Sequence, residues 1–511
     1  MENKSVRIVE RPKFRFQTLF SNPILHYIVL VLVSISTRLE LLSRSYPLSF
    51  DDGVYAMSIK HVSEGLQPFA DVFSSQGPFF LTVVSLPSQI FGFHPWSMRI
   101  VPFLSGIAVV VFSYKISRRF MSRSWAFFAA LLVALSGTLL RATVPITSDG
   151  VLAAVVLGCV LLNLRFIDSP KIVNAIWLGL AVGFGCGIKS IFMIPFLTFL
   201  LIVTWKISFK VRLIAGFISV VTFLVPFTIF GFKDTLDQSI LYHLGKDESL
   251  DLKSNLSKIF TTFSAFDPIL LLLSFLSVFV CISYLVQLVR SRSANRAELI
   301  TRIFDMHKPY IFILTLGLGT YFLLIVQAPL FRNHLCAAVA PLAISTTWII
   351  SRFISSLNVE TNTAKAKSLG MAAVAIFLVV SIAATFKTYS DPLIAQSAEL
   401  KGAIAALTVV KDGALIMTND PGLAFATSTD VPTGLEDTSR FRFLNKNDEI
   451  KISVQSFNYI LKNNKSICAF AVAPLPISDE LKLRDLAPNT WNQVYDNGYT
   501  IWLNPSEDCV K

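Results

Sequence analysis

Acidic side chains beside long apolar runs are the residues of this sequence best suited to chemistry. Asp51 and Asp52 follow Phe50 in FDDGVYAMSIKHV, and Asp149 lies in ATVPITSDG, directly before another apolar run. An ionisable group at or inside a membrane is costly and is by default a functional candidate. Carboxylates that meet at one membrane face could supply a general base, orient a hydroxyl nucleophile or hold a divalent cation. The pair alone is equally typical of a capped helix, so the third acid is what favours a site.

Positively charged groups accompany these acids. Lys189 ends a glycine-rich apolar run, and Arg332 and His334 lie in APLFRNHLCAAVAP. A phosphate leaving group needs cations nearby, because negative charge develops on it as the bond to it breaks. Simpler interpretations exist for two of the three: Lys189 as an anchor that reaches toward the membrane surface, and Arg332 as a contact to lipid headgroups.

The composition indicates the class of protein. The 511 residues are 53% hydrophobic and only 15% charged, and the mean hydropathy is +0.61. A soluble protein of this length has a far larger polar fraction, so we expect a polytopic α-helical membrane protein. The net charge of +12 would suggest nucleic acid if the basic residues formed one face. They instead form short clusters between apolar runs, which is a topology signal, and no nucleic-acid partner is expected.

The apolar runs predict a membrane domain over residues 24–386. A crossing needs roughly 20 apolar residues. Runs of about that kind lie at 24–42, 98–117, 124–141, 150–167, 213–231, 267–289, 309–327, 334–352 and 368–386. The run 174–205 is too long for one span, and its glycines followed by Lys189 predict two short spans that meet at a hairpin. The total is about eleven crossings.

The charge distribution predicts the orientation. Basic residues before the first apolar run are typical of a cytoplasmic segment, here 1–23, and without a cleavage pattern the run is expected to be a retained anchor. Lys and Arg then concentrate in the inner loops. The weakly apolar segment 79–93 is expected to be a juxtamembrane helix at the outer face. The outer side receives a first loop, 43–97, a loop, 232–266, and a tail, 387–511.

The first outer loop holds further candidates. Apolar residues recur at helical spacing from Tyr55 to Leu66 and predict an amphipathic helix lying on the outer surface. Tyr55 could hydrogen-bond a substrate, although tyrosines are common at membrane interfaces. Asp71 lies near Ser and Gly and is more typical of a turn. His243, in the other outer loop, is expected to be a loop histidine with its hydrogen bonds satisfied.

The tail differs in composition and predicts a small extracytoplasmic α/β domain. Its short apolar runs at 414–417, 468–473 and 499–503 are typical of strands, and 393–410 and 447–462 have helical spacing. Cys468 and Cys509 would both be exported with this domain. A disulfide between them and two unpaired cysteines are both open.

Three of these segments together resemble the polyprenyl-phosphate-sugar transferases of the GT-C superfamily, which include protein O-mannosyltransferases and the lipid A aminoarabinose transferase. Residues 50–80 resemble their first extracytoplasmic loop, in which an acidic pair opens a juxtamembrane helix and a tyrosine follows. SDGVLAAVVLGCVLL, with Asp149, resembles a second acidic motif. LGLAVGFGCGIKSIFMIP resembles the glycine-rich span that ends in Lys189. The resemblance covers about residues 25–345 as architecture.

The chain also departs from this family pattern. Members often carry Lys-Pro-Pro or His-Pro-Pro where this chain has Gln76, Gly77 and Pro78, so one cationic donor contact is missing. The tail segment 418–443 is similar to an exported segment of some bacterial members that ends in Asp-Thr-Ser. No role is assigned to that segment here.

The resemblance implies a function at the outer face of a bacterial cell membrane. The expected enzyme transfers one sugar, with inversion, from a polyprenyl-phosphate donor to a hydroxyl of a cell-envelope lipid, glycan or protein. Asp51 would take or orient the acceptor proton, while Asp52 and Asp149 would position the acceptor. Lys189, Arg332 and His334 would stabilise the departing phosphate. Tyr55 would hydrogen-bond the donor or the acceptor. No cofactor is certain; a divalent cation, if used, would be bound by Asp51 and Asp149.

Two alternatives remain open at this point. A transporter or lipid flippase would line a path with the same charged groups, but the two halves show no internal repeat and the acids cluster at one face. A non-catalytic membrane scaffold whose tail binds a partner is the other alternative. It stays open because Gln76 lies where members of the family often carry a cation.

Overall fold

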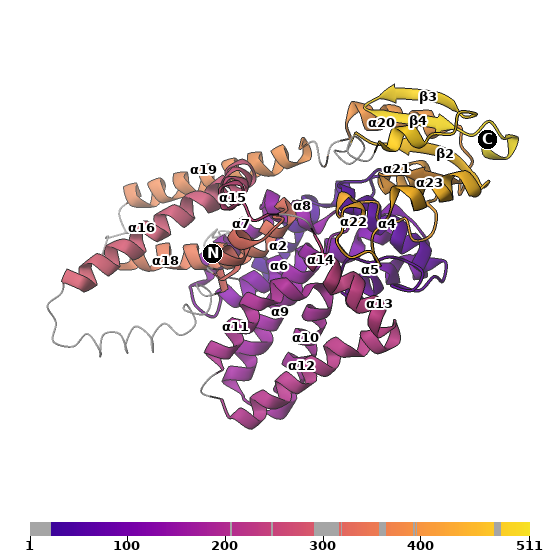
Figure 1. Cartoon of the computed structure of the whole chain (residues 1–511). Coiled ribbons are helices and arrows are strands. Elements are labelled where there is room, and N and C mark those ends of the chain that lie inside the picture. Colours follow the sequence, from indigo (N-terminus) through magenta and orange to yellow (C-terminus); the bar gives the residue numbers. More distant parts are fainter. Residues whose placement is uncertain are drawn as a thin grey trace, which may run out of the picture.

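A bundle of helices with a small sheet domain docked at one end makes up the molecule (Figure 1). The computed structural model describes residues 22–204, 207–246, 249–290, 316–317, 319–356, 364–391, 394, 396–474 and 482–511. The N-terminal half of the bundle runs through α2 (Pro23–Ser36), α3 (Leu39–Leu42), α4 (Phe50–Ser63), α5 (Pro78–Phe91), α6 (Pro95–Ser117), α7 (Arg123–Ala134), α8 (Gly137–Thr143), α9 (Ser148–Asp168) and α10 (Ile172–Lys189). It continues through α11 (Ile194–Val203), α12 (Phe209–Ile229), α13 (Phe232–Leu236), α14 (Tyr242–Leu244), α15 (Leu252–Phe266), α16 (Pro268–Arg290), α18 (Cys336–Ser356) and α19 (Ala364–Tyr389).

Five of the described helical segments are long and apolar enough to cross a membrane: α6, α9, α10, α12 and Arg332–Ile354, which contains most of α18. The bent pairs α7 with α8 and α15 with α16 raise the number to as many as seven if each pair is one span. The expected total of about eleven stays a prediction, because much of the run 309–327 lies outside the described residues, as do residues 1–21 of the expected cytoplasmic segment.

The span expected at 124–141 is not one continuous helix. The chain bends by 58° between α7 and α8. Ser136 begins the second helix, because its hydroxyl accepts a hydrogen bond from the Leu139 amide. The fully buried Arg38 donates to the Ala134 carbonyl at the break and to the Thr143 hydroxyl. The polar groups that a break exposes inside a bundle are thus partly satisfied by a buried cation.

The helix expected on the outer surface, α4, is instead buried. Ser49 caps it by accepting from the Asp52 amide, and residues 52–59 are all buried. The bundle covers one side of α4, and α21 (Pro421–Thr427) of the C-terminal domain covers the other. The two backbones touch, since a Cβ on Gly53 would lie 2.5 Å from the Gly422 Cα. The prediction of an amphipathic surface helix failed because sequence spacing did not reveal this second cover.

The C-terminal domain (residues 396–474 and 482–511) contains a four-stranded sheet in the order β1-β2-β4-β3. The strands β1 (Leu415–Thr418) and β2 (Ile467–Val472) are parallel, whereas β4 (Tyr499–Leu503) runs antiparallel to both β2 and β3 (Asn492–Asn497). The expected α/β character and the strands at 414–417, 468–473 and 499–503 are therefore confirmed. The helices expected at 393–410 and 447–462 are shorter, as α20 (Ala398–Leu407) and α23 (Val454–Asn463).

Sequence reasoning missed one strand and two short helices of this domain and left the state of its two cysteines open. β3 was missed because it is an edge strand whose residues are mostly exposed and polar. The short helices α21 and α22 (Arg440–Phe443) are too brief to show periodicity. Cys468 and Cys509 form a disulfide, which ties β2 to the end of the chain and decides between the two open alternatives.

Replacing Gly53 by Ala tests the contact between α4 and the C-terminal domain. The added Cβ would clash with backbone rather than with a flexible side chain, so the two helices must separate. We expect faster limited proteolysis of the C-terminal domain in the variant. Gly216→Ala is the matched control, since a Cβ there meets nothing within 4 Å. Equal digestion of both variants would contradict the contact.

Candidate functional site

The centre of the site is an ion pair between the ends of two helices. Asp149 lies in the first turn of α9, and Lys189 is the last residue of α10. The Lys189 ammonium donates to the Asp149 carboxylate over 2.8 Å, and both side chains are largely buried. These two residues, expected to meet from the sequence, do lie together.

Glycines bring the first outer loop against this ion pair. The Gly77 amide donates to the Ile188 carbonyl over 3.1 Å, and a Cβ on Gly77 would lie 2.3 Å from the Gly187 oxygen. Only glycine permits so close an approach of two backbones. As a result Gln76 reaches α9, where its amide oxygen accepts a hydrogen bond from the Ser148 hydroxyl over 2.7 Å. Gln76 therefore tethers the first outer loop to the neighbour of Asp149.

Asp51 lies in the first turn of α4 with a solvent-accessible side chain. Although solvent reaches this side chain, the protein atoms crowded around its carboxyl reduce its hydration, and this is the main cause that raises its pKa to about 6. The charges of Asp149 and Asp437 act in the same direction. The cations Lys189 and Lys246 act against this rise. No hydrogen bond from the described residues occupies the Asp51 carboxylate. It is a group that changes protonation near neutral pH and is available to a ligand.

Asp52 is a different kind of residue, because its carboxylate is fully used inside the protein. It is completely buried and pairs with the equally buried Arg99 over 2.6 Å. Its oxygens also accept from the Leu48 and Ile146 amides, at 2.9 and 2.8 Å. The expected role of Asp52 at the acceptor does not fit this burial. Its bonds instead join α4, α6 and the loop before α9.

The remaining expected residues divide into two groups. Tyr55 is buried, its hydroxyl lies 3.5 Å from that of Ser75, and burial followed by the Asp51 charge raises its pKa well above the usual value, so it stays a phenol. His334 is buried and interacts electrostatically with Asp149. Arg332 is exposed, and its charge acts on Arg141.

Two loop residues confirm their structural interpretations. The Asp71 carboxylate accepts from the Gln67 amide over 2.9 Å, as a turn former does. The His243 ring bonds the Ser75 carbonyl over 2.6 Å. Burial, then the charges of Lys246 and Lys189, lower the pKa of His243 to about 3, so the ring is neutral and donates this bond.

Sequence reasoning missed two charged members of the cluster, Lys246 and Asp437. Both act electrostatically on Asp51. Lys246 follows α14, and Asp437 lies in the C-terminal domain, within the Asp-Thr-Ser motif noted in the sequence. The Asp-Thr-Ser motif was the only sequence signal that pointed to Asp437. The motif gives no indication of where the tail packs, so it could not place Asp437 near Asp51.

A small pocket with mostly apolar walls, called the apolar groove below, borders the charged cluster at Asp149. The other residues that line it come from α9, from the helical residues 316–317 and 319–326, and from the start of α18. They are Leu152, Ala153, Val156, Leu157, Leu316, Thr320, Cys336, Ala337, Ala340 and Pro341. A ligand with a charged head and a hydrocarbon tail matches a charged cluster that lies next to these apolar residues.

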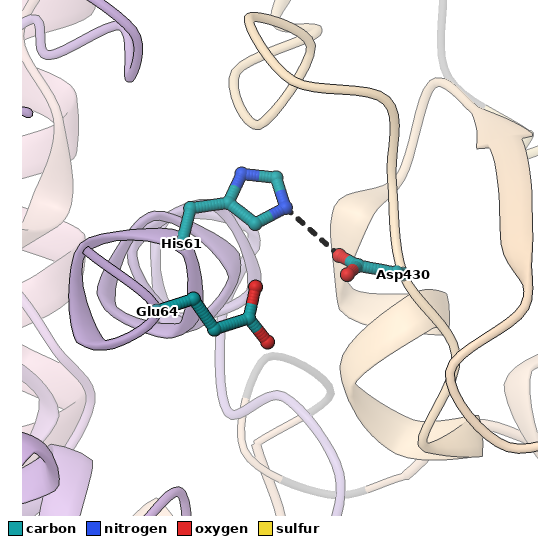
Figure 2. A group of neighbouring side chains, drawn as sticks. All are labelled: His61, Glu64 and Asp430. Atoms are coloured by element: carbon teal, nitrogen blue, oxygen red, sulfur yellow. Dashed lines mark hydrogen bonds and ion pairs between the residues drawn. The ribbon is translucent and has the colours of Figure 1, made fainter. Parts of the chain in front are cut away.

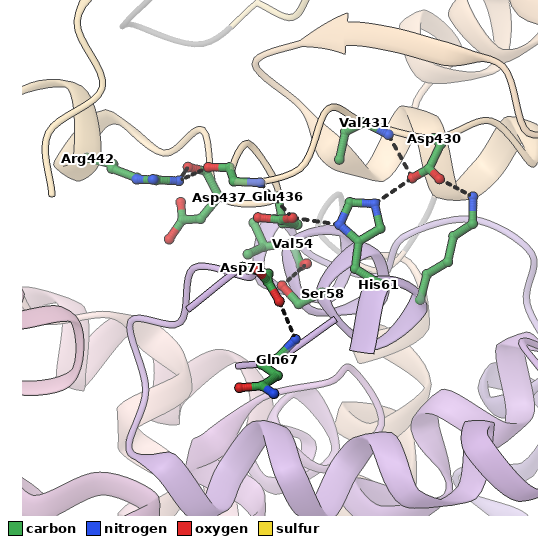
Figure 3. Close-up of polar contacts among 12 residues, drawn as sticks. Val54, Ser58, His61, Gln67, Asp71, Asp430, Val431, Glu436, Asp437 and Arg442 are labelled. Carbon is green, nitrogen blue, oxygen red and sulfur yellow. Dashed lines mark hydrogen bonds and ion pairs between the residues drawn. The ribbon is translucent and has the colours of Figure 1, made fainter. Parts of the chain in front are cut away.

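A charged clamp joins α4 to the C-terminal domain beside the site. Glu436 and Asp430 lie on either side of the His61 ring, at 2.6 and 2.9 Å from its two nitrogens (Figure 3). Lys60 also pairs with Asp430, over 2.8 Å. Burial opposes the charged ring, but the hydrogen bonds and charges of the two carboxylates outweigh it and raise the pKa of His61 to about 9. At neutral pH the ring is therefore an imidazolium that donates from both nitrogens.

The same region contains the one group of possible metal ligands found among the described residues. His61, Glu64 and Asp430 offer ligand atoms within 4.8 Å of one another (Figure 2). A metal needs a neutral imidazole with a free lone pair. Both nitrogens of His61 instead bond carboxylates, whose charges are balanced by the imidazolium and Lys60. The donor set fits a clamp between two parts of the chain better than a metal centre.

Comparisons with known proteins agree on the fold. Residues 75–230 match the family model of dolichyl-phosphate-mannose-protein mannosyltransferase. Among curated protein sequences, no relative matches the chain. ArnT from Cupriavidus metallidurans in the apo state has a TM-score of 0.62 and 14% identity, covering 94% of this chain and 97% of that chain. The same protein bound to undecaprenyl phosphate has a TM-score of 0.59 and 15% identity, covering 95% and 98%.

A second solved neighbour is more distant. The Archaeoglobus fulgidus oligosaccharyltransferase tethered to an acceptor peptide has a TM-score of 0.51 and 12% identity, covering 96% of this chain and 75% of that chain. The chain thus has the fold of ArnT over nearly its whole length. This likeness confirms the expected helical membrane-protein fold.

Adjacent aspartates allow a matched stability test. Asp52→Asn should lower the free energy of unfolding by about 3–5 kcal/mol, because it leaves the buried Arg99 without its counter-charge. Asp51→Asn should leave stability nearly unchanged, since Asp51 has no direct partner to lose. Thermal or denaturant unfolding in detergent measures both. Equal losses in the two variants would contradict the different roles assigned to these neighbours.

Proposed function

We propose that this protein transfers a sugar from a polyprenyl-phosphate donor to a hydroxyl acceptor at the outer face of the membrane. One observation carries the proposal: an available carboxylate, Asp51, lies in the same charged cluster as the Lys189–Asp149 pair, where an apolar groove begins. The likeness to ArnT, which has been solved with undecaprenyl phosphate, and the mannosyltransferase family match support this chemistry.

The donor binds with its isoprenoid tail in the apolar groove and its phosphate in the cluster. The groove wall of α9 and α18 matches a hydrocarbon chain, and Asp149 marks its polar end. Lys189 and Lys246 supply positive charge there. They balance the charge that develops on the phosphate as it leaves. His334 adds a buried ring at the same place.

Asp51 acts on the acceptor. Its ionised carboxylate accepts the proton of the acceptor hydroxyl as the oxygen bonds to the anomeric carbon. The bond from that carbon to the phosphate oxygen breaks in the same displacement, and the configuration inverts. Asp149 holds the Lys189 ammonium toward the departing phosphate. For a divalent cation, if one takes part, Asp51 and Asp149 are the proposed ligands.

The topology follows from the same proposal. We place residues 1–23 in the cytoplasm, residues 24–386 in the membrane domain and residues 387–511 outside the cell. Asp51 on α4 and the C-terminal domain that covers α4 then share one compartment (Figure 1). Membrane lipids and a hydroxyl-bearing molecule of the cell envelope are the partners.

Asp51→Asn tests the proposed base. Transfer should fall at least about 100-fold, since an amide cannot accept the proton. The rate of the wild-type protein should rise with pH up to about 6 and then level off, because only the ionised form works and the pKa of Asp51 is raised to about 6. The assay uses the purified protein in lipid with radiolabelled polyprenyl-phosphate sugars and membrane acceptors.

Asp71→Asn is the control, because Asp71 is a turn aspartate in the same loop. Retained transfer in Asp51→Asn would remove Asp51 from the role of base. Labelled lipid that crosses the bilayer without a new product would favour the flippase alternative over transfer.

A further inference from the structure

A segment of the C-terminal domain, residues 434–442, extends down to the first outer loop. Arg442 fixes its shape by donating to the carbonyls of Gly434 and Asp437, over 2.5 and 3.1 Å (Figure 3). The same guanidinium lies 3.9 Å from the ring centre of Phe73, a residue of the first loop. The segment is therefore held against the part of the chain that carries Ser75 and Gln76.

Contacts on both sides of Asp437 fix where it lies. Glu436, the residue before it, bonds the His61 ring of α4 over 2.6 Å. The Ser439 hydroxyl lies 3.3 Å from the hydroxyl of Tyr242 in α14. Asp437 is thus held between α4 and α14, and α14 contacts Phe73 and Ser75 of the first outer loop.

The Asp437 carboxylate is buried, and its charge acts on Asp51 of the cluster. One of its oxygens accepts from the Ser439 amide over 2.9 Å, which sets the side-chain direction. Its charge acts on Asp51 and Tyr55 of α4 and on Tyr242 of α14. The charge of the Arg442 guanidinium acts on this carboxylate and offsets part of the cost of burying it. A ligand hydroxyl that donates to the carboxylate would offset more of that cost.

We propose that Asp437 binds the acceptor beside Asp51, so that the C-terminal domain forms one wall of the reaction site. This inference rests on the proposed sugar transfer and deepens it. The donor side is already defined by the groove and by Lys189, both on α9, α10 and α18. Asp437 belongs to the C-terminal domain, which we place outside the membrane.

The charge of this wall limits the class of acceptor. Asp51 and Asp437 are two carboxylates whose charges act on each other. An ionised carboxylate only accepts hydrogen bonds. The two carboxylates suit a polyhydroxyl molecule that donates several hydroxyl protons, such as a glycan. An acceptor with a phosphate or carboxylate next to its reacting hydroxyl would be repelled by both. We infer a neutral, sugar-like acceptor at this position.

The test is a set of separate kinetic titrations of acceptor and donor. Asp437→Asn should raise the acceptor KM about tenfold or more, the loss expected for one hydrogen bond to a charged group, and leave the donor KM unchanged. Asp437→Glu, which keeps the carboxylate, should recover part of the loss. Asp508→Asn is the control, as an exposed aspartate of the same domain. Thermal unfolding of each variant accompanies the kinetics.

The outcomes separate this inference from the proposed function. An unchanged acceptor KM in a stable Asp437→Asn protein would overturn the role of Asp437 and leave sugar transfer standing. A rise of both the donor KM and the acceptor KM together with a lower melting temperature, without recovery in Asp437→Glu, would show a structural role. That result would also overturn the inference. A wild-type protein that transfers no sugar from any polyprenyl-phosphate donor would overturn both.

Discussion

The buried ion pair of Asp52 with Arg99 is the interaction on which the site depends. Both side chains are completely buried, and the Asp52 carboxylate also binds two backbone amides that belong to separate loops. Successive residues of a helix point about 100° apart. With Asp52 fixed into the protein interior, the preceding Asp51 is turned toward the charged cluster. One aspartate of the pair orients the helix, and the other is left available for chemistry.

Close backbone contacts at glycine then assemble the remaining walls. Gly77 against Gly187 brings the first loop to the end of α10, and Gly53 against Gly422 seats the C-terminal domain on α4. The imidazolium of His61 adds a charged bond to each of two carboxylates at the second contact. Gln76 gives the first outer loop a neutral tether, while Lys246 brings positive charge to the same cluster from another loop. The site is consequently shared among segments far apart in the sequence.

The sequence predicted the parts of this arrangement that depend on local pattern. The apolar runs, the strands of the tail, the pairing of Asp149 with Lys189 and the resemblance to a known fold all came from residue type and spacing. Burial of α4 could not be predicted, because its second cover comes from α21, some 370 residues later. The position of Asp437 and the different environments of Asp51 and Asp52 could not be predicted for the same reason. Which of two adjacent acids is buried depends on partners that only the folded chain brings together.

The affinity for a polyprenyl phosphate, measured on the purified protein in lipid nanodiscs, tests most directly whether this cluster is a site for a lipid-linked phosphate. Undecaprenyl phosphate is the probe, and Lys189→Met is the variant that removes the central cation while keeping much of the side-chain volume. Lys253→Met, at an exposed position of α15, is the control. The account predicts tight binding by the wild-type and control proteins and at least about tenfold weaker binding by Lys189→Met. Equal affinity in all three proteins would contradict it.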